Sequence, residues 1–374
     1  MPIEIREVKT GADRKTFIYL PEKIHAGHAY WVHPIYMDDK KYFDPKKNKA
    51  FEYCDVGMWL AWRDGRPVGR VMGIINRRFN AHRKEEIARF AYLETSEDRE
   101  TFQALVRTVE AWARAKGATR IIGPYGFSDQ DPEGWIIEGF DHRATIATYY
   151  NFEWMPRYIE EMGYGKDVDY FVYKIPLPKE MPELYTKVFE RTQRRGSFVI
   201  HEFRRRKDLK PWIVPIFTLM NETYVNSNIY GYAPLSEKEM EDFAARYLPV
   251  VDPRFVKLVT KDNEPAAFVI AMPDMTEGIQ KARGRMFPFG FLKVLRAAKK
   301  TKQLDLLLGA IKESHRGVGL DALMGYKMFK SAMEAGMEFM DTHHELESNE
   351  KVRAEMIRQG GVVYKKFRVW TKTL

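Results

Sequence analysis

Residues 304–320 read LDLLLGAIKESHRGVGL, and no other stretch says as much about the fold. Residues 304–311 are apolar apart from Asp305, as is typical of a strand buried within a sheet. A basic turn with two glycines covers 312–319, and an amphipathic pattern begins at Leu320. The stretch therefore predicts a strand that leads through a tight turn into a helix, a building block of mixed α/β sheets.

The turn is suited to binding an anion. Backbone N–H groups at the start of a helix have no partner within the helix, and the helix dipole adds positive potential there. Gly317 and Gly319 allow the backbone to approach a ligand closely, while His315 and Arg316 add positive charge. These features favour a diphosphate as the ligand, although a tight packing turn without a ligand would use the same glycines.

An internal repeat divides the chain into two halves. The turn sequence 64–68 aligns with 262–266 at an offset of 198 residues, and Asn151 aligns with Asn349 at the same offset. Each turn sequence lies between two apolar runs, so each predicts a β-hairpin.

Each half also carries one amphipathic helical pattern, over 100–116 and over 320–335. The predicted fold is therefore α/β, with two tandem modules that each have a mixed, mostly antiparallel sheet flanked by helices. We expect the modules to span 1–176 and 195–374, with a linker over 177–194.

Composition limits the classes of protein that fit. A length of 374 residues favours two domains over one. Cys54 is the only cysteine, which excludes an internal disulfide and a thiolate metal cluster. The sequence starts with charged residues where a signal peptide would be apolar, and it has no apolar run of membrane-spanning length. We therefore expect a soluble cytoplasmic protein.

The net charge of +9 is unevenly distributed, because 278–304 contains eight Lys or Arg residues and no acid. Within it, 287–300 is amphipathic, with Phe291, Leu292 and Leu295 on one side and basic residues on the other. Such a segment could lie on an anionic membrane. The favoured interpretation is an ordinary packed helix with a wet basic face, and no nucleic-acid partner is expected.

The turn resembles the acyl-CoA-binding signature of the GNAT family, in which Arg or Gln is followed by x-x-Gly-x-Gly or Ala. Arg316 and Gly319 match, Gly317 occupies a free position that is often Gly, and Asp321 stands where the family prefers Gly or Ala. The resemblance of this half covers about 255–374. As a whole, the chain resembles bacterial proteins of tandem-GNAT type that are described as acetyltransferases.

The resemblance implies acetyl-CoA or another acyl-CoA as co-substrate and a small amine as acceptor. In the family, the turn holds the diphosphate, a backbone N–H of the preceding strand holds the thioester carbonyl, and the later Asn contacts the pantetheine or nearby backbone. The cofactor-binding residues implied here are Ala310, Ile311, His315, Arg316, Gly317, Val318, Gly319, Leu320, Asp321 and Asn349.

Acyl transfer to an amine needs a base for the amine, a polarised carbonyl and a proton for the departing thiolate. The candidate bases are His344, Glu345 and Glu347, which precede Asn349. The family usually has a Tyr as general acid seven residues after the Asn, and Met356 stands there instead. The adjacent pair of histidines predicts no metal site, because neighbouring side chains of a strand point to opposite faces.

The first module lacks the glycine turn. Its counterpart, 91–100, contains four acids from Glu94 to Glu100 and would repel a diphosphate. We therefore expect this module not to bind CoA and to form a wall of the acceptor pocket.

Three functions are consistent with these features. The leading one is an acyl-CoA-dependent N-acyltransferase that acts on a small amine. The second is an aminoacyl or acyl transferase of the Fem type that uses charged tRNA or a carrier protein. The third is a non-catalytic binding protein that has kept the fold, which the missing Tyr would suit.

Overall fold

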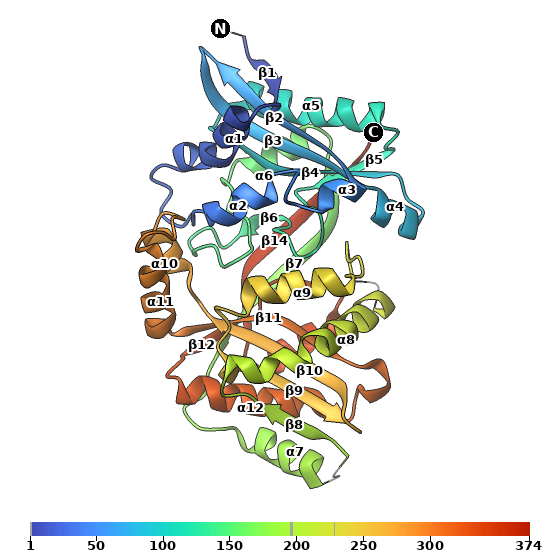
Figure 1. Ribbon diagram of the computed structural model, residues 1–374, viewed down its shortest axis with the longest axis vertical. Coiled ribbons are helices and arrows are strands. Elements are labelled where there is room, and N and C mark those ends of the chain that lie inside the picture. Colours follow the sequence, from blue (N-terminus) through green and yellow to red (C-terminus); the bar gives the residue numbers. More distant parts are fainter. Residues whose placement is uncertain (1, 195–196, 228) are drawn as a thin grey trace.

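One sheet runs the length of the molecule (Figure 1). The computed structural model describes residues 2–194, 197–227 and 229–374. The strands follow one another across the sheet in the order β1-β2-β3-β4-β5-β14-β7-β12-β11-β10-β9-β8, with β6 paired to β14 and β13 to β7. The strands are β1 (Glu4–Glu7), β2 (Cys54–Arg63), β3 (Arg66–Asn76), β4 (Ile87–Thr95), β5 (Arg120–Gly123), β6 (Trp135–Glu138), β7 (Gly165–Pro176), β8 (Val199–Glu202), β9 (Val256–Lys261), β10 (Glu264–Pro273), β11 (Gln303–Ile311), β12 (Phe339–Asp341), β13 (Glu345–Leu346) and β14 (Val362–Thr373).

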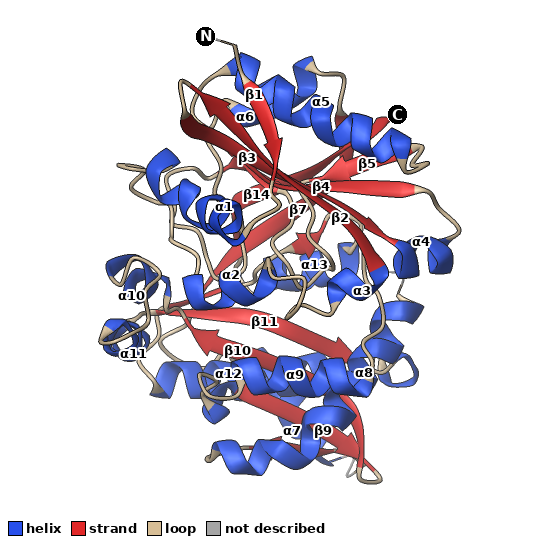
Figure 2. Ribbon diagram, turned by 45° about the horizontal axis from the view of Figure 1, so that its top comes forward, coloured by secondary structure: helices blue, strands red, loops and turns tan. Residues whose placement is uncertain are grey.

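Helices cover both faces of this sheet (Figure 2). The α-helices are α1 (Gly11–Ile24), α2 (Tyr36–Tyr42), α3 (Ala50–Tyr53), α4 (Arg77–Arg83), α5 (Arg99–Ala115), α6 (Met155–Glu161), α7 (Glu183–Arg194), α8 (Ile213–Asn226), α9 (Glu237–Tyr247), α10 (Thr276–Lys281), α11 (Gly290–Lys300), α12 (Leu320–Glu334) and α13 (Glu350–Arg358). Short 3₁₀ turns occur at Arg206–Trp212, Pro253–Phe255 and Glu313–His315.

Both predicted hairpins are present. The first joins β2 to β3 and the second joins β9 to β10. Asp64 and Gly65 have φ values of 52° and 71°, and Asp262 and Asn263 have φ values of 52° and 65°. Two consecutive positive φ angles match the twist that a two-residue hairpin requires, and Asp, Asn and Gly adopt them most readily.

Alternate residues of each strand face different helices. In β2, Trp59 packs in the cluster that includes α5, while Leu60 packs in the cluster that includes α1. In β9, Val259 packs with α12 and Leu258 with α8. The period of two along the strands therefore builds a core on each face of the sheet, and the predicted α/β fold is confirmed.

The two halves exchange their last strands. β14, at the end of the chain, pairs with β5 of the first half, and β7 pairs with β12 of the second half. β7 and β14 also pair with each other along most of their length. Trp370 of β14 is accordingly buried in the core of the first half, and Ile175 of β7 in that of the second. The sheet is therefore continuous from one half to the other. The domain boundaries at 176 and 195 remain a prediction.

The segment 177–194, expected as a linker, instead contains α7. This helix packs on α12, where Tyr185 meets Phe329 with ring centroids 5.4 Å apart and Phe189 meets Tyr326 at 4.2 Å. The segment has apolar residues at helical spacing, which bury one face of α7 against the second half, and its bounds as a linker remain a prediction.

Candidate functional site

The parallel strands β11 and β12 separate shortly after they begin to pair. They are matched at three positions, the last of which joins Asp305 to Asp341. From Leu306 onward, the edge of β11 that faced β12 is open, and the segment 342–349 lies beyond β12 on the other side of the opening. A parallel pair that splays in this way exposes backbone groups to a ligand, since the ladder no longer uses them.

The direction of the backbone hydrogen bonds identifies which groups face the opening. Lys312 N–H donates to Ala266 O of β10 at 2.8 Å. Because antiparallel neighbours alternate between bonded and non-bonded pairs, Ala310 also faces β10, whereas Gly309 and Ile311 direct their backbone groups to the open edge. Of the two residues expected to hold a thioester carbonyl, Ile311 is the one with its N–H on that edge.

The turn at 312–319 has the backbone expected of a glycine turn. Gly317 and Gly319 have φ values of 75° and 93°, and Gly319 is the N-cap of α12. Half-buried Val318 and fully buried Leu320 anchor the turn in the core below α12. A Cβ at Gly319 would lie 2.9 Å from Thr192 Oγ1 in the last turn of α7, so α7 bounds this side of the turn.

Charged side chains flank the start of α12. Arg316 Nη2 donates to Ser227 Oγ at 2.8 Å and its Nε to Ile311 O at 3.4 Å, so the guanidinium bridges the end of β11 and the end of α8. His315 is partly exposed, and Asp321 is exposed in the first turn of the helix. The Asp321 carboxylate therefore interacts favourably with the positive end of the helix dipole, and a phosphate bound there would compete with it for the same interaction.

Glu345 is the best placed of the three candidate bases. Burial raises the pKa of its carboxyl to about 8. It lies in β13, paired with β7 opposite Phe171. The Tyr224 hydroxyl donates a hydrogen bond to Gly309 O at 3.3 Å. Its pKa is raised chiefly by burial, and the charges of Asp129 and Glu345 raise it further. Glu345 is thus electrostatically coupled to a side chain that contacts the open edge of β11.

The other two candidate bases are less available. Burial lowers the pKa of the His344 imidazole well below its ordinary value, so the ring is neutral, and it stacks on Tyr170 at 5.1 Å. Glu347 accepts hydrogen bonds from Lys166 Nζ at 2.6 Å and from Asp169 N–H at 3.1 Å. Glu347 is therefore engaged in joining 342–349 to β7.

Asn349 and His343 are held by local contacts. Asn349 is half-buried at the N-terminus of α13, where its N–H donates to Leu346 O at 3.0 Å and its side chain makes no capping bond. His343 Nε2 lies 2.7 Å from Ile146 O in the loop of the first half, while its ring centroid lies 5.3 Å from that of His344.

The first half contributes a group of acids that the sequence patterns did not indicate. Asp129 and Glu133 lie in the loop after β5, and the pKa of Asp129 rises to about 7 because of burial and the nearby Asp131. Burial, and then Asp129, raise the pKa of Glu133 well above its ordinary value. Asp129 also raises the pKa of Tyr224, so this loop approaches the opening of the second half. The extra length of 123–147 is visible in the sequence, but which of its residues are buried is not.

The corresponding opening of the first half is filled by the protein itself. There β4 and β5 are matched only from Ile87 to Arg89. Beyond that point, Tyr92 N–H donates to the Tyr149 hydroxyl at 3.3 Å, and Tyr125 N–H donates to Phe90 O at 2.9 Å. The two halves thus share the same arrangement of strands, but the gap between the two parallel strands is filled in the first half and open in the second.

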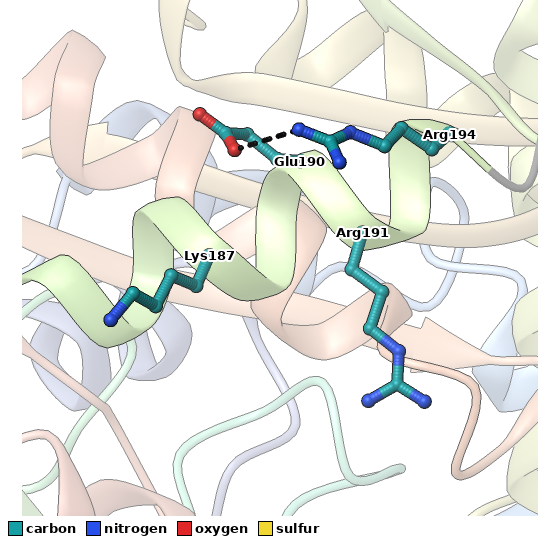
Figure 3. A pocket seen from close by; sticks show the side chains of 4 residues that line it. All are labelled: Lys187, Glu190, Arg191 and Arg194. Atoms are coloured by element: carbon teal, nitrogen blue, oxygen red, sulfur yellow. Dashed lines mark ion pairs between the residues drawn. The ribbon is translucent and has the colours of Figure 1, made fainter.

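A surface hollow on α7 lies outside this arrangement. Lys187, Glu190, Arg191 and Arg194 line it, and Figure 3 shows Arg194 turned toward Glu190 while Arg191 points away. All four residues are exposed, whereas Thr192 is buried, so the hollow belongs to the outer surface of the helix.

Comparison with known proteins agrees with this geometry. The sequence profile of the Acetyltransferase (GNAT) family matches residues 22–125. A tandem GNAT protein from the clavulanic acid biosynthesis pathway superposes with a TM-score of 0.55 at 11% identity, covering 100% of this chain and 98% of that chain. The chain has a tandem GNAT fold. A GCN5-related N-acetyltransferase from Sphaerobacter thermophilus also has this fold, with a TM-score of 0.50, 13% identity and coverage of 99% and 95%.

A relative of similar length carries a more specific name. The bacterial ceramide synthase of Caulobacter vibrioides is 28% identical over 389 residues, which cover 100% of this chain and 98% of the relative. The family match and the name of this relative together support a transferase. That match lies in the first half and excludes the turn at 312–319, so the roles of the residues around the turn remain predictions.

Proposed function

We propose that the second half of this GNAT-fold chain transfers an acyl group from acyl-CoA to an amine at the open edge of β11. One observation carries the proposal: β11 and β12 separate after Asp305 and Asp341, which leaves the edge of β11 at Gly309 and Ile311 open, and the Tyr224 hydroxyl contacts that edge at Gly309 O. A general base works best when its pKa is near the working pH, and Glu345 meets that condition.

Each chemical requirement has a candidate group. The diphosphate would bind at the start of α12 beside Arg316, and Ile311 N–H would hold the thioester carbonyl and stabilise the developing oxyanion. The amine nitrogen attacks the carbonyl carbon, and Glu345 accepts the ammonium proton. The C–S bond then breaks, and Tyr224, in place of the Tyr that Met356 replaces, donates a proton to the thiolate and recovers one from the protonated Glu345.

The full-length relative supports a finer proposal for the substrates. It is named a ceramide synthase, and a ceramide is the amide of a fatty acid with a long-chain amino alcohol. We therefore propose a long-chain acyl-CoA as donor and a long-chain amino alcohol as acceptor. This narrows the expected small amine to one with an apolar tail.

Mass spectrometry of the products tests both the proposed acyl transfer and the proposed long-chain substrates. The protein is incubated with acetyl-CoA or palmitoyl-CoA, each with a long-chain amino alcohol or a short amine of the same head group. We expect an amide and free CoA, most rapidly with the two long-chain substrates. A product only from the short substrates would refute the lipid assignment, while release of no CoA from any pair would refute acyl transfer.

A binding role without catalysis is the second candidate, and Met356 at the expected position of the general acid favours it. Calorimetry separates the two functions. A binding protein would take up acyl-CoA with a measurable heat and release it unchanged, whereas the transferase consumes it once the amine is added.

A further inference from the structure

Helix α11 presents apolar side chains to solvent. Phe287 is 73% exposed, Phe289 69% and Leu292 52%, and Phe291 and Leu295 are also exposed. The expected burial of Phe291, Leu292 and Leu295 is therefore wrong. The helical period of 3.6 residues shows which side chains share a face of α11, but it does not show which face packs on the protein. In the structure the buried face is the narrow one that contains Gly290 and Val294.

The buried face of α11 leaves no room for the apolar face to turn inward. α11 packs closely on α10, since a Cβ at Gly278 would lie 2.5 Å from Val294 Cα. Val294 joins Met272, Met275 and Ile279 in a small core. Figure 1 shows α10 and α11 together at one side of the molecule.

Basic residues flank the exposed apolar side chains. Arg296 and Lys299 form no ion pair in the part of the chain that the structure describes, and no acid occurs between 278 and 304. The two acids that flank this segment are Glu277, which pairs with Lys281, and Asp305, which is buried. The outer surface of α11 thus combines exposed aromatic and aliphatic side chains with the positive charges of Arg296 and Lys299, which form no ion pair among the described residues.

We propose that α11 and the turn before it, 287–300, dock this protein on an anionic lipid bilayer. An amphipathic helix with Phe and Leu on one face and Lys and Arg beside them binds the interface by burying the apolar face and attracting acidic headgroups. A second copy of the chain is the less suitable occupant, because two-fold pairing through this face would place the same uncompensated cations opposite each other. None of the described helices is long and apolar enough to cross a bilayer, so the contact is a peripheral one.

Vesicle flotation of the full chain, without acyl-CoA, tests the proposal. We expect the native protein to float with mixed phosphatidylglycerol–phosphatidylcholine vesicles and to stay behind with phosphatidylcholine alone. Phe289→Ser with Leu292→Ser should lower the bound fraction at least about tenfold, and so should Arg296→Glu with Lys299→Glu. High salt should weaken binding of the native protein, because exposed charges are screened.

Two matched controls carry the same kinds of change elsewhere. Ile357→Ser with Val362→Ser removes two exposed apolar side chains from α13 and β14, and Lys187→Glu with Arg191→Glu reverses two exposed charges on α7 (Figure 3). Both controls should float like the native protein. Circular dichroism checks that every variant is folded.

Several results would overturn the proposal. The native protein could stay behind with both kinds of vesicle, or the α7 control could lose binding as fully as the α11 variants, which would indicate unspecific charge attraction. A dimer that Phe289→Ser dissociates, without vesicle binding, would assign the face to a second copy instead. Because no acyl-CoA is present, loss of the proposed transfer activity would not alter any of these results.

Discussion

Replacing Glu345 with Gln should make the protein more stable at high pH and, at the same time, much less active. The substitution keeps the shape of the side chain and removes its ability to ionise. In the folded protein the pKa of Glu345 is about 8, against an ordinary value of 4.5. Between these pH values the folded state holds a proton that the unfolded state has released. The free energy of unfolding of the native protein therefore falls as the pH rises from 4.5 to 8. Above pH 8 the destabilisation by the ionised carboxylate is complete.

The size of the stability effect follows from the same values. Each pKa unit corresponds to about 1.36 kcal/mol, so the cost at high pH is at most about 5 kcal/mol. Glu345 is partly exposed, and solvent screening reduces the expected effect to about 1–3 kcal/mol. Urea unfolding at pH 4 and pH 9 measures it: Glu345→Gln should match the native protein at the lower pH, which is below the ordinary pKa of 4.5, and exceed its stability at the higher pH.

The activity of the same variant should change in the opposite direction. Loss of a general base costs about 10²–10⁴-fold in rate. In the native protein kcat/KM should rise with pH and level off above about 8, where Glu345 is ionised. Glu347→Gln is the matched control, because Glu347 is held by Lys166 and should change activity less than about tenfold. Transfer by Glu345→Gln within about tenfold of native would refute the base assignment, and equal stability at both pH values would refute the argument from burial.

Further predictions concern the turn, the buried ion pair and the exchanged strand. Arg316→Glu should weaken acyl-CoA binding at least about tenfold in calorimetry, because a charge-assisted phosphate contact contributes about 1.5–3 kcal/mol. Asp321→Ala should tighten binding, and unchanged affinity in both variants would place the diphosphate elsewhere. Lys365→Met leaves Asp341 buried without its cation, 3.4 Å away in the native protein, and should cost about 3–5 kcal/mol in urea unfolding. Removal of 362–374 takes away a strand that both halves share, so both should lose structure together, and a first half that stays folded in limited proteolysis would contradict this.

The sequence alone determined the features that depend on neighbouring residues. Asp64 followed by Gly65 predicts a tight hairpin because both residues adopt positive φ readily, and the structure has that hairpin. The helices α5 and α12 were predicted within one residue of their observed ends, since apolar residues at three- and four-residue spacing define one face. The glycine turn before Leu320 was predicted as the start of a helix for the same local reason.

Tertiary structure decided everything that depends on distant partners. β7 and β14 have similar strand patterns, and nothing local specifies that each joins the opposite half, because strand pairing is settled by the shared cores around Ile175 and Trp370. The pattern of α11 predicts a helix but not that Leu292 faces solvent. Likewise Glu345 and Glu347 are the same residue type two positions apart. Burial raises the pKa of one, an ion pair with Lys166 engages the other, and only the packing of 342–349 against β7 sets this difference.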